Sequence, residues 1–326
     1  MKRLLTGLQP SGELTLGSLI GGISGCLRNQ DMYESFVFVP DMHAITVDQD
    51  PKLLHERIRK NVALYIACGL DPKKNTFYIQ SENLYHANLS WILECCTYMG
   101  EASRMTQFKD KSKNKENVSV GLFTYPILMA ADILLYSADV VPTGIDQKQH
   151  VELARNLATR FNNKYGETFK LPEPMIPSIG AKIKDLQEPN KKMSKSSSNL
   201  KGTILLLDEE SVIRKKIMSA VTDSEGRVYF DEENKPGISN LLTIYSSLKD
   251  ISIKEAEKHF ADYNYGNLKR EVADVVVEKL LDIQSKYNEL INSSVLDDIL
   301  DEGRKKTLSI AREKYEEVMF KVGLGR

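Results

Sequence analysis

A short segment past the middle of the chain combines the residue types that bind phosphate groups. Residues 191–199, Lys-Lys-Met-Ser-Lys-Ser-Ser-Ser-Asn, hold three lysines and four serines and no branched aliphatic residue. Ammonium groups act as point charges on phosphate oxygens, and hydroxyl and backbone amide groups add matching donors. The segment therefore favours binding of a polyphosphate whose negative charge grows during a reaction. A solvated basic linker has the same composition, so this segment alone leaves both interpretations open.

Two turns that contain glycine are candidates for a nucleotide site. Residues 6–12, Thr-Gly-Leu-Gln-Pro-Ser-Gly, end an apolar run, and residues 15–18, Thr-Leu-Gly-Ser, open a helical pattern. Amides at a helix start attract anions, and glycine lets a ring or a phosphate approach the backbone. Residues 142–150 follow another apolar run and place Asp146 where it could accept hydrogen bonds from ribose hydroxyls. Glycine turns before helices are common, however, and Asp146 could equally cap the helix that follows.

One carboxylate interrupts the apolar segment 125–136. Tyr125, Met129 and Asp132 fall on one face of the predicted helix, because they are spaced by four and three residues. A buried ionised group without a partner is costly, so Asp132 requires a hydrogen-bond donor. That donor is either a protein side chain or the N–H group of a ligand in an apolar slot.

The elements that must position these residues alternate along the first half of the chain. Apolar runs of strand length predict strands, at residues 3–8, 36–39, 76–80 and 140–141. Helical spacing of apolar residues predicts the helices between them, at residues 16–23, 51–66, 91–98, 125–136 and 147–157. This alternation indicates a parallel sheet covered on both faces, which binds ligands at the carboxyl ends of its strands. The predicted fold class is α/β, a Rossmann-type doubly wound parallel sheet with a mainly α-helical C-terminal domain.

In the second half of the chain, residues 211–221 predict a helix and residues 223–226 a polar turn, and residues 238 to about 322 have almost wholly the pattern of amphipathic helices. We therefore expect an α/β catalytic domain at 1–195, a helical domain at 196–290, and a C-terminal helix at 291–326 that packs back on the first domain. The charge-rich residues 109–115 predict a loop. Basic residues of the helical half are candidate contacts for nucleic acid, namely Lys201, Arg214, Lys215, Lys216 and Arg227.

Composition limits the class of protein. The net charge is −1, so any nucleic acid must be bound by local basic patches. The four cysteines form no C-x-x-C pair, which argues against a zinc site, an iron–sulfur site and a disulfide framework. The N-terminal apolar run stops at Pro10, too short for a signal peptide, and no other run approaches the length of a membrane span. We therefore expect a reduced, cytoplasmic protein that is not in a membrane.

The order of these motifs resembles that of the class I aminoacyl-tRNA synthetases. Residues 192–196 match the Lys-Met-Ser-Lys-Ser motif completely, whereas residues 15–18 match the first motif, often His-Ile-Gly-His, only at the glycine and differ at both outer positions. Within the family, the chain is similar to the bacterial tryptophanyl members over nearly its full length. The segments that carry this similarity are residues 7–12, 41–46, 104–109, 129–134, 144–147, 220–223 and 236–242.

The resemblance implies a role for each matching residue. The ATP-binding residues would be Gln9, Pro10, Ser11, Gly17, Ser18, Gly144, Ile145, Asp146, Ile183, Lys192, Met193, Ser194, Lys195 and Ser196. The catalytic residues among or beside them would be Lys192, Lys195, Ser194 and Lys111. The tryptophan-binding residues would be Asp132, Met129, His43, Tyr125, Gln147, Val141, Leu5 and Gln107. Asp132 would accept the indole N–H, which can only donate.

The family also implies substrates and partners. The expected reaction activates L-tryptophan with ATP, releases pyrophosphate and transfers the amino acid to tRNA(Trp), with Mg²⁺ bound through ATP and not at a dedicated protein site. A homodimer is expected, with the apolar residues 91–99 at its interface. Several positions depart from the usual pattern of the family, with expected effects on activity or inhibitor sensitivity: Ser18, Leu5, Thr143, and the pair Ser197-Ser198 in place of the frequent Asp-Pro.

Three other functions remain open from the sequence. A buried aspartate could also accept a hydrogen bond from a phenol, as in a tyrosyl-specific relative. A catalytically silent paralogue could sense tryptophan or bind RNA, although the intact lysines and aspartates argue against this. A small nucleotidyltransferase would share the nucleotide-binding half but would not use the long helical half.

Overall fold

The computed structural model describes residues 1–8, 10, 13–113, 116–144, 147–175, 182–194 and 200–326. Its sheet is formed by the strands β1 (Arg3–Gly7), β2 (Glu34–Val39), β3 (Asn75–Ile79), β4 (Val140–Pro142) and β5 (Glu173–Met175). All neighbouring strands are parallel, in the order β3-β2-β1-β4-β5. This order reverses between β1 and β4, which confirms the predicted doubly wound parallel sheet. Strand β5, Glu-Pro-Met, was not predicted, because it contains no apolar run.

Two apolar clusters cover the two faces of the sheet. Along β2, Phe36 and Phe38 belong to one cluster while Val37 and Val39 belong to the other, because successive side chains of a strand point to opposite faces. The Val37 face is covered by α1 (Leu16–Ser18), the π-helical turn η1 (Leu19–Ile23) and α4 (Pro51–Ala67), and α2 (Ser24–Asn29) follows η1. The Phe36 face is covered by α5 (Tyr85–Cys95), α8 (Val120–Leu135), α9 (Lys148–Tyr165) and α14 (Val295–Val322).

Helix α4 shows how local sequence sets a helix boundary. The Oδ1 atom of Asp50 accepts hydrogen bonds from the backbone amides of Lys52, at 2.9 Å, and Leu53, at 3.0 Å. Pro51 occupies the first turn, where its missing N–H costs nothing. Gly69 follows the helix with a φ of +115°, a conformation that glycine adopts without steric cost. The predicted start and end of this helix are therefore confirmed.

On the Phe36 side of the sheet, one predicted helix has the wrong bounds and one predicted loop is wrong. The helix expected at 91–98 is α5, which begins at Tyr85 and ends at Cys95, and a separate turn, α6 (Met99–Ala102), follows. The start was missed because the buried apolar stripe of α5 begins at Leu89, before residue 91, and continues with Ile92 and Leu93. Residues 109–112 are helical in α7 (Thr106–Ser112) and do not form a loop, and Phe108 of α7 packs edge-to-face on Phe123 at 5.1 Å.

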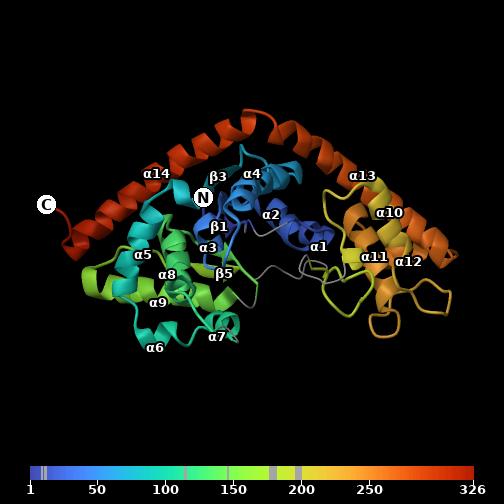
Figure 1. Ribbon diagram of the computed structural model, residues 1–326, viewed down its shortest axis with the longest axis horizontal. Helices are drawn as coiled ribbons and strands as arrows, with labels where there is room; N and C mark the ends of the chain where they lie inside the picture. The colour runs from blue at the N-terminus through green and yellow to red at the C-terminus, as the bar shows by residue number, and fades with distance from the viewer. Residues whose placement is uncertain (9, 11–12, 114–115, 145–146, 176–181, 195–199) are drawn as a thin grey trace.

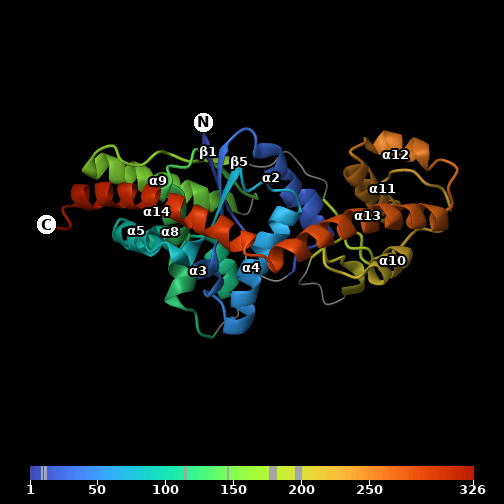
Figure 2. The same ribbon diagram turned by 90° about the horizontal axis from the view of Figure 1, so that it is seen from above.

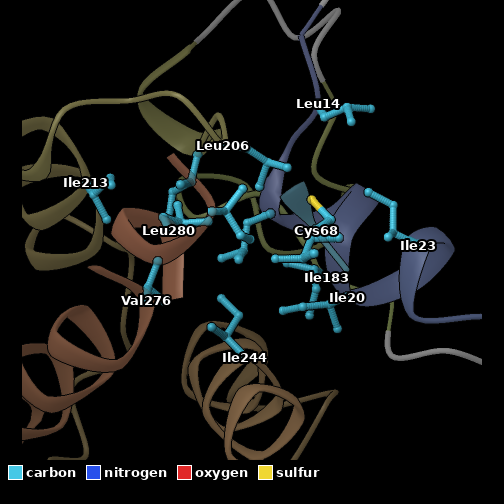
Figure 3. Packing of buried hydrophobic residues seen from close by; sticks show 14 of the residues in the cluster. Leu14, Ile20, Ile23, Cys68, Ile183, Leu206, Ile213, Ile244, Val276 and Leu280 are labelled. Carbon is cyan, nitrogen blue, oxygen red and sulfur yellow. The ribbon is translucent and has the colours of Figure 1, made fainter. Parts of the chain in front are cut away.

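The helical half contains α10 (Glu210–Met218), α11 (Pro236–Lys249), α12 (Ile253–His259) and α13 (Tyr265–Ile291). These helices lie at one end of an elongated molecule, and α13 and α14 run along one long side (Figures 1 and 2). The apolar cluster on the Val37 face continues into this half without a break, since Ile20 and Ile23 share it with Ile244, Val276 and Leu280 (Figure 3). The division at residue 195 therefore crosses a continuous apolar core. None of the helices within the described ranges has the length and apolar content needed to cross a membrane.

Helix α14 crosses the backbone of β3 at a glycine. A Cβ atom at Gly303 would overlap the carbonyl oxygen of Phe77, so the close approach of the two elements requires glycine. We expect Gly303→Ala to lower the free energy of unfolding by about 1–3 kcal/mol, because α14 must shift from β3. Urea denaturation measures this loss. Gly25→Ala is the matched control, since a Cβ atom on Gly25 of α2 meets nothing within 4 Å. Equal stability of the two variants would contradict the close approach.

Candidate active site

A cleft of about 700 Å³ opens beside the carboxyl ends of β1 and β4, where the strand order reverses. Its lining comes from the end of β1, the α1 turn and the residues that follow it as far as Cys26, from Tyr65 on α4, from the end of β4, and from the segment 182–194. This is the position at which doubly wound sheets bind ligands. The predicted ATP-binding residues that line it are Gly17, Ser18, Gly144, Ile183, Lys192, Met193 and Ser194.

The turn at residues 15–18 is closed by a capping box. Thr15 Oγ1 accepts from the amide of Ser18 at 3.1 Å, and Ser18 Oγ accepts from the amide of Thr15 at 3.4 Å. The two hydroxyls are 3.1 Å apart, so Ser18 is engaged within the turn. A Cβ atom on Gly17 would contact Met193 and Ile183 at 3.4 and 3.6 Å. The segment that carries Lys192 therefore packs directly against this turn, with room for an ordinary contact at Gly17.

Lys192 lies on a short antiparallel hairpin. The amide of Met193 donates to the Ile183 carbonyl at 3.0 Å, and the amide of Asp185 donates to the Lys191 carbonyl at 2.9 Å. Met193 and Ile183 are buried, whereas Lys192 is exposed and lines the cleft. Burial of the apolar residues thus anchors the hairpin while the ammonium group remains available to an anion.

Contacts to the helical half hold the other side of this hairpin. The side chain of Asn240, on α11, accepts from the amide of Lys184 at 2.8 Å and donates to its carbonyl at 2.9 Å. The amide of Val221 donates to the Leu186 carbonyl at 2.8 Å. The hairpin is therefore positioned by the sheet half and the helical half together.

Asp132 lies in the middle of α8 and is 1% exposed. Its Oδ2 atom accepts from His43 Nε2 at 2.7 Å, and its Oδ1 atom accepts from Gln80 Nε2 and His86 Nδ1, both at 2.7 Å. Burial alone would raise the pKa of Asp132, but the charge and hydrogen bond of His43, together with the hydrogen bond from His86, lower this pKa to about 2. Asp132 is therefore ionised at neutral pH, and its donors include protein side chains, one of the two alternatives expected from the sequence.

Tyr125 lies beside this carboxylate on the same helix. Its ring meets His43 edge-to-face at 6.2 Å, and its hydroxyl is 3.1 Å from His150 Nε2. The Nζ atom of Lys111, on α7, lies 4.7 Å from the centre of the Tyr125 ring. Burial raises the pKa of Tyr125 to about 12, so its hydroxyl stays protonated. The structure thus brings Lys111, His43, Tyr125 and Asp132 together, although none of these four residues lines the 700 Å³ cleft.

The remaining predicted site residues have different positions. Leu5 and Val141 are buried in the apolar cluster of the Phe36 face, and Met129 packs against it. Pro10 is buried, Gln107 is half-buried on α7, and Gln147 precedes α9 and donates its amide to the Gly144 carbonyl at 3.0 Å. Six predicted residues lie outside the described ranges: Gln9, Ser11, Ile145, Asp146, Lys195 and Ser196.

Sequence analysis missed two residues that contact Asp132. Gln80 and His86 are completely buried, at the end of β3 and in α5. The signal in the sequence is weak: Gln80 is the polar last residue of the predicted strand 76–80, and His86 lies in the short polar stretch that follows it. Among the described residues, no group of three or more histidine, cysteine, aspartate and glutamate side chains is arranged to hold a metal ion.

The two parts of the site provide complementary chemistry. The cleft offers an ammonium group, small residues and a glycine turn, which suit a nucleotide with its phosphates. The Asp132 side offers a buried acceptor among aromatic side chains, which suits a flat ring that carries an N–H group.

Comparison with known proteins identifies relatives of the whole chain. The family model described as tRNA synthetases class I (W and Y) matches residues 1–281. The tryptophan–tRNA ligase of Halalkalibacterium halodurans is 53% identical over 325 residues, which cover 100% of this chain and 98% of that protein.

Two solved structures are similar over nearly their full length. The tryptophanyl-tRNA synthetase of Mycoplasma pneumoniae has a TM-score of 0.87 and 37% identity, with 100% of this chain and 98% of that chain covered. The tryptophanyl-tRNA synthetase of Campylobacter jejuni, complexed with ADP and tryptophan, has a TM-score of 0.87 and 37% identity, with 99% of this chain and 100% of that chain covered.

Proposed function

We infer that this chain, which belongs to the class I tRNA synthetases (W and Y), acts as a tryptophan–tRNA ligase. The observation that carries the inference is the 53% identity to a tryptophan–tRNA ligase along the whole chain. This similarity favours tryptophan over tyrosine as the substrate, and an enzyme over a silent paralogue. The buried acceptor Asp132 supports the same choice, because the indole nitrogen can only donate.

The first step is the activation of tryptophan. Its carboxylate, already ionised at neutral pH, attacks the α-phosphorus of ATP, and the bond to pyrophosphate breaks, so no general base is required. Negative charge develops on the pyrophosphate oxygens, and Lys192 on the cleft wall is positioned to stabilise it. We assign the same role to Lys195, with Ser194 as a donor. Mg²⁺ would enter bound to the ATP phosphates, as part of that substrate.

The amino-acid side of the site sets specificity. We assign the indole N–H to Asp132 and the faces of the indole ring to His43, Tyr125 and Met129. The position of Lys111 over the Tyr125 ring, on the Asp132 side of the site, suits a contact with the tryptophan carboxylate or the α-phosphate.

In the second step, a hydroxyl of the terminal ribose of tRNA attacks the tryptophan carbonyl of the adenylate, the bond from that carbonyl to the phosphate breaks, and AMP leaves. We propose that α10 to α13 form a domain that reads the anticodon, and that α14 belongs with the sheet half, against which it packs. Of the basic candidates there, Arg214 pairs with Glu210 and Asp274, and Lys216 pairs with Asp208. Lys215 and Arg227 are therefore the better candidates for phosphate contacts.

A second copy of the chain is proposed to cover an apolar surface on the sheet half. Large apolar residues there are more than half exposed: Leu84, Trp91, Tyr98, Met99 and Val120. They lie on or beside α5, α6 and the start of α8, which are in mutual contact, so one partner can bury them together. Sedimentation that gives a monomer at micromolar concentration would reject this dimer.

Measurement of ATP–pyrophosphate exchange tests the activity. We expect exchange that depends on tryptophan, with tyrosine supporting it at least about 10³-fold less well, because a site built on one buried polar contact rejects a poorly matched ligand strongly. Omission of Mg²⁺ should abolish exchange. If neither amino acid supports exchange, a catalytically silent paralogue that senses tryptophan or binds RNA would be the better account of the function.

We also propose that the protein is located in the cytoplasm, where tRNA is charged for translation. Cell fractionation tests this location.

A further inference from the structure

The two carboxylate oxygens of Asp132 have different surroundings. Oδ1 accepts hydrogen bonds from Gln80 and His86, whose side chains are completely buried. Among the described residues, Oδ2 accepts one hydrogen bond, from His43, whose side chain is 15% exposed and faces Tyr125. A carboxylate oxygen can accept two hydrogen bonds. Oδ1 is therefore saturated by the protein interior, and Oδ2 is the oxygen that can receive a ligand donor.

A chain of buried hydrogen bonds extends from Oδ1 towards α14. His86 Nε2 lies 2.9 Å from the hydroxyl of Tyr136, and that hydroxyl accepts from Asn83 Nδ2 at 3.1 Å. The same amide nitrogen lies 3.5 Å from the carbonyl of Thr307 on α14. His86, Tyr136 and Thr307 have no solvent exposure, and Asn83 is 1% exposed. Each polar group must therefore find its partner within the chain.

The chemistry of the end groups sets the direction of these hydrogen bonds. An ionised carboxylate only accepts, so His86 Nδ1 must donate to Asp132, and an amide nitrogen only donates, so Asn83 must donate to Tyr136. A neutral His86 then has a bare Nε2, which accepts from the Tyr136 hydroxyl. In this arrangement His86, Tyr136 and the Asn83 amide each use their hydrogen-bonding capacity without conflict.

We propose that His86 is a specificity-determining positioning residue for tryptophan. In its neutral form with the proton on Nδ1, it fixes Oδ1 and so presents Oδ2 of Asp132 as an acceptor aimed at the indole N–H. The proposal rests on the proposed function, in which Asp132 binds that N–H group. Without the His86 hydrogen bond, Oδ1 is held by Gln80 alone. The carboxylate is then less tightly fixed and its contact with the indole loosens, while stacking of the ring on its neighbours persists.

Substrate discrimination separates this role from a purely structural one. The probe is the tryptophan analogue in which sulfur replaces the indole N–H, since it keeps the ring shape but cannot donate. The measured quantity is kcat/KM for tryptophan divided by kcat/KM for the analogue, in ATP–pyrophosphate exchange, with the KM for ATP as a second readout.

Two polar substitutions provide a matched pair. In His86→Asn the amide lies near the Nδ1 position and can still donate to Asp132, so the ratio should stay within several-fold of wild type. In His86→Gln the amide lies near the Nε2 position, keeps the Tyr136 contact and loses the donor to Asp132. The ratio should fall by about 10- to 100-fold, the range for a hydrogen bond to a charged group. The KM for ATP should not change in either variant. An equal loss for both substrates in His86→Gln would overturn the proposal.

A parallel variant separates this proposal from the proposed function. If Asp132→Asn keeps the wild-type ratio, Asp132 does not bind the indole N–H and both proposals fail. If Asp132→Asn collapses the ratio but His86→Gln does not, only the role of His86 fails. Should the His86 variants not fold, ¹⁵N NMR of histidine-labelled wild type with bound tryptophan decides the question. Protonation of His86 at Nδ1 alone is expected, and an Nε2–H tautomer or an imidazolium would overturn the proposal.

Discussion

Asp132→Asn is expected to lower kcat/KM for tryptophan by about 10²- to 10³-fold, because no orientation of the new amide satisfies its neighbours. With the amide oxygen towards Gln80 and His86, the NH₂ group faces the indole N–H, donor against donor. With the amide reversed, the NH₂ group instead faces the two buried donors at 2.7 Å. ATP–pyrophosphate exchange at varied tryptophan concentration measures the loss, most of which should appear in the KM for tryptophan.

The control for this substitution is Asp282→Asn, on the surface of α13, where the carboxylate makes an exposed ion pair with Lys286. Its kinetics should match wild type. Both variants should be compared by thermal unfolding, because a buried amide between donors also reduces stability. A wild-type KM for tryptophan in Asp132→Asn would remove Asp132 from the specificity site.

The second large effect is expected from Lys235, immediately before α11, whose side chain is 2% exposed. Its ammonium group bonds to Asp223 and Glu225, both at 3.0 Å, to the Arg227 carbonyl at 3.0 Å and to the Tyr265 hydroxyl at 2.9 Å. Lys235→Met should lower the free energy of unfolding by about 3 kcal/mol, because it leaves the carboxylates without their cation. Urea denaturation measures the change, and Lys286→Met, which removes the exposed pair of α13, should alter stability little.

This destabilisation should depend on pH. Burial alone would raise the pKa of Asp223, but the hydrogen bonds from Tyr265 and Lys235 lower it below its ordinary value. A carboxylate whose pKa is lowered by folding stabilises the protein above its unfolded pKa, and this stabilisation is lost as the pH falls through the folded pKa. The difference between wild type and Lys235→Met should therefore be constant near neutral pH and shrink below about pH 4. A difference that does not change in acid would show that packing, not charge, dominates at Lys235.

Local sequence was sufficient to predict a helix or strand where neighbouring residues determine that element. The N-cap Asp50 and the following Pro51 define the start of α4, and the apolar runs identify β1 to β4 because buried parallel strands are apolar on both faces. Prediction from local sequence failed where a tertiary contact outweighs the local pattern of residues. Residues 109–112 have the charge pattern of a loop, yet they are helical in α7, which is anchored by Phe108 on Phe123.

The candidate site shows the same difference between what the sequence predicts and what tertiary packing determines. The sequence alone established the chemical groups: a lysine- and serine-rich segment, a glycine turn, and one carboxylate in an apolar helix, whose order identified the family. Only the tertiary structure decided which groups meet. Gln80 and His86 reach Asp132 across 52 and 46 residues of sequence, and Asn240 holds the Lys184 backbone across 56. Such pairings depend on how the crossovers of the sheet and the helices of the second half pack. No local spacing encodes that geometry, because it follows from burial of the whole apolar core.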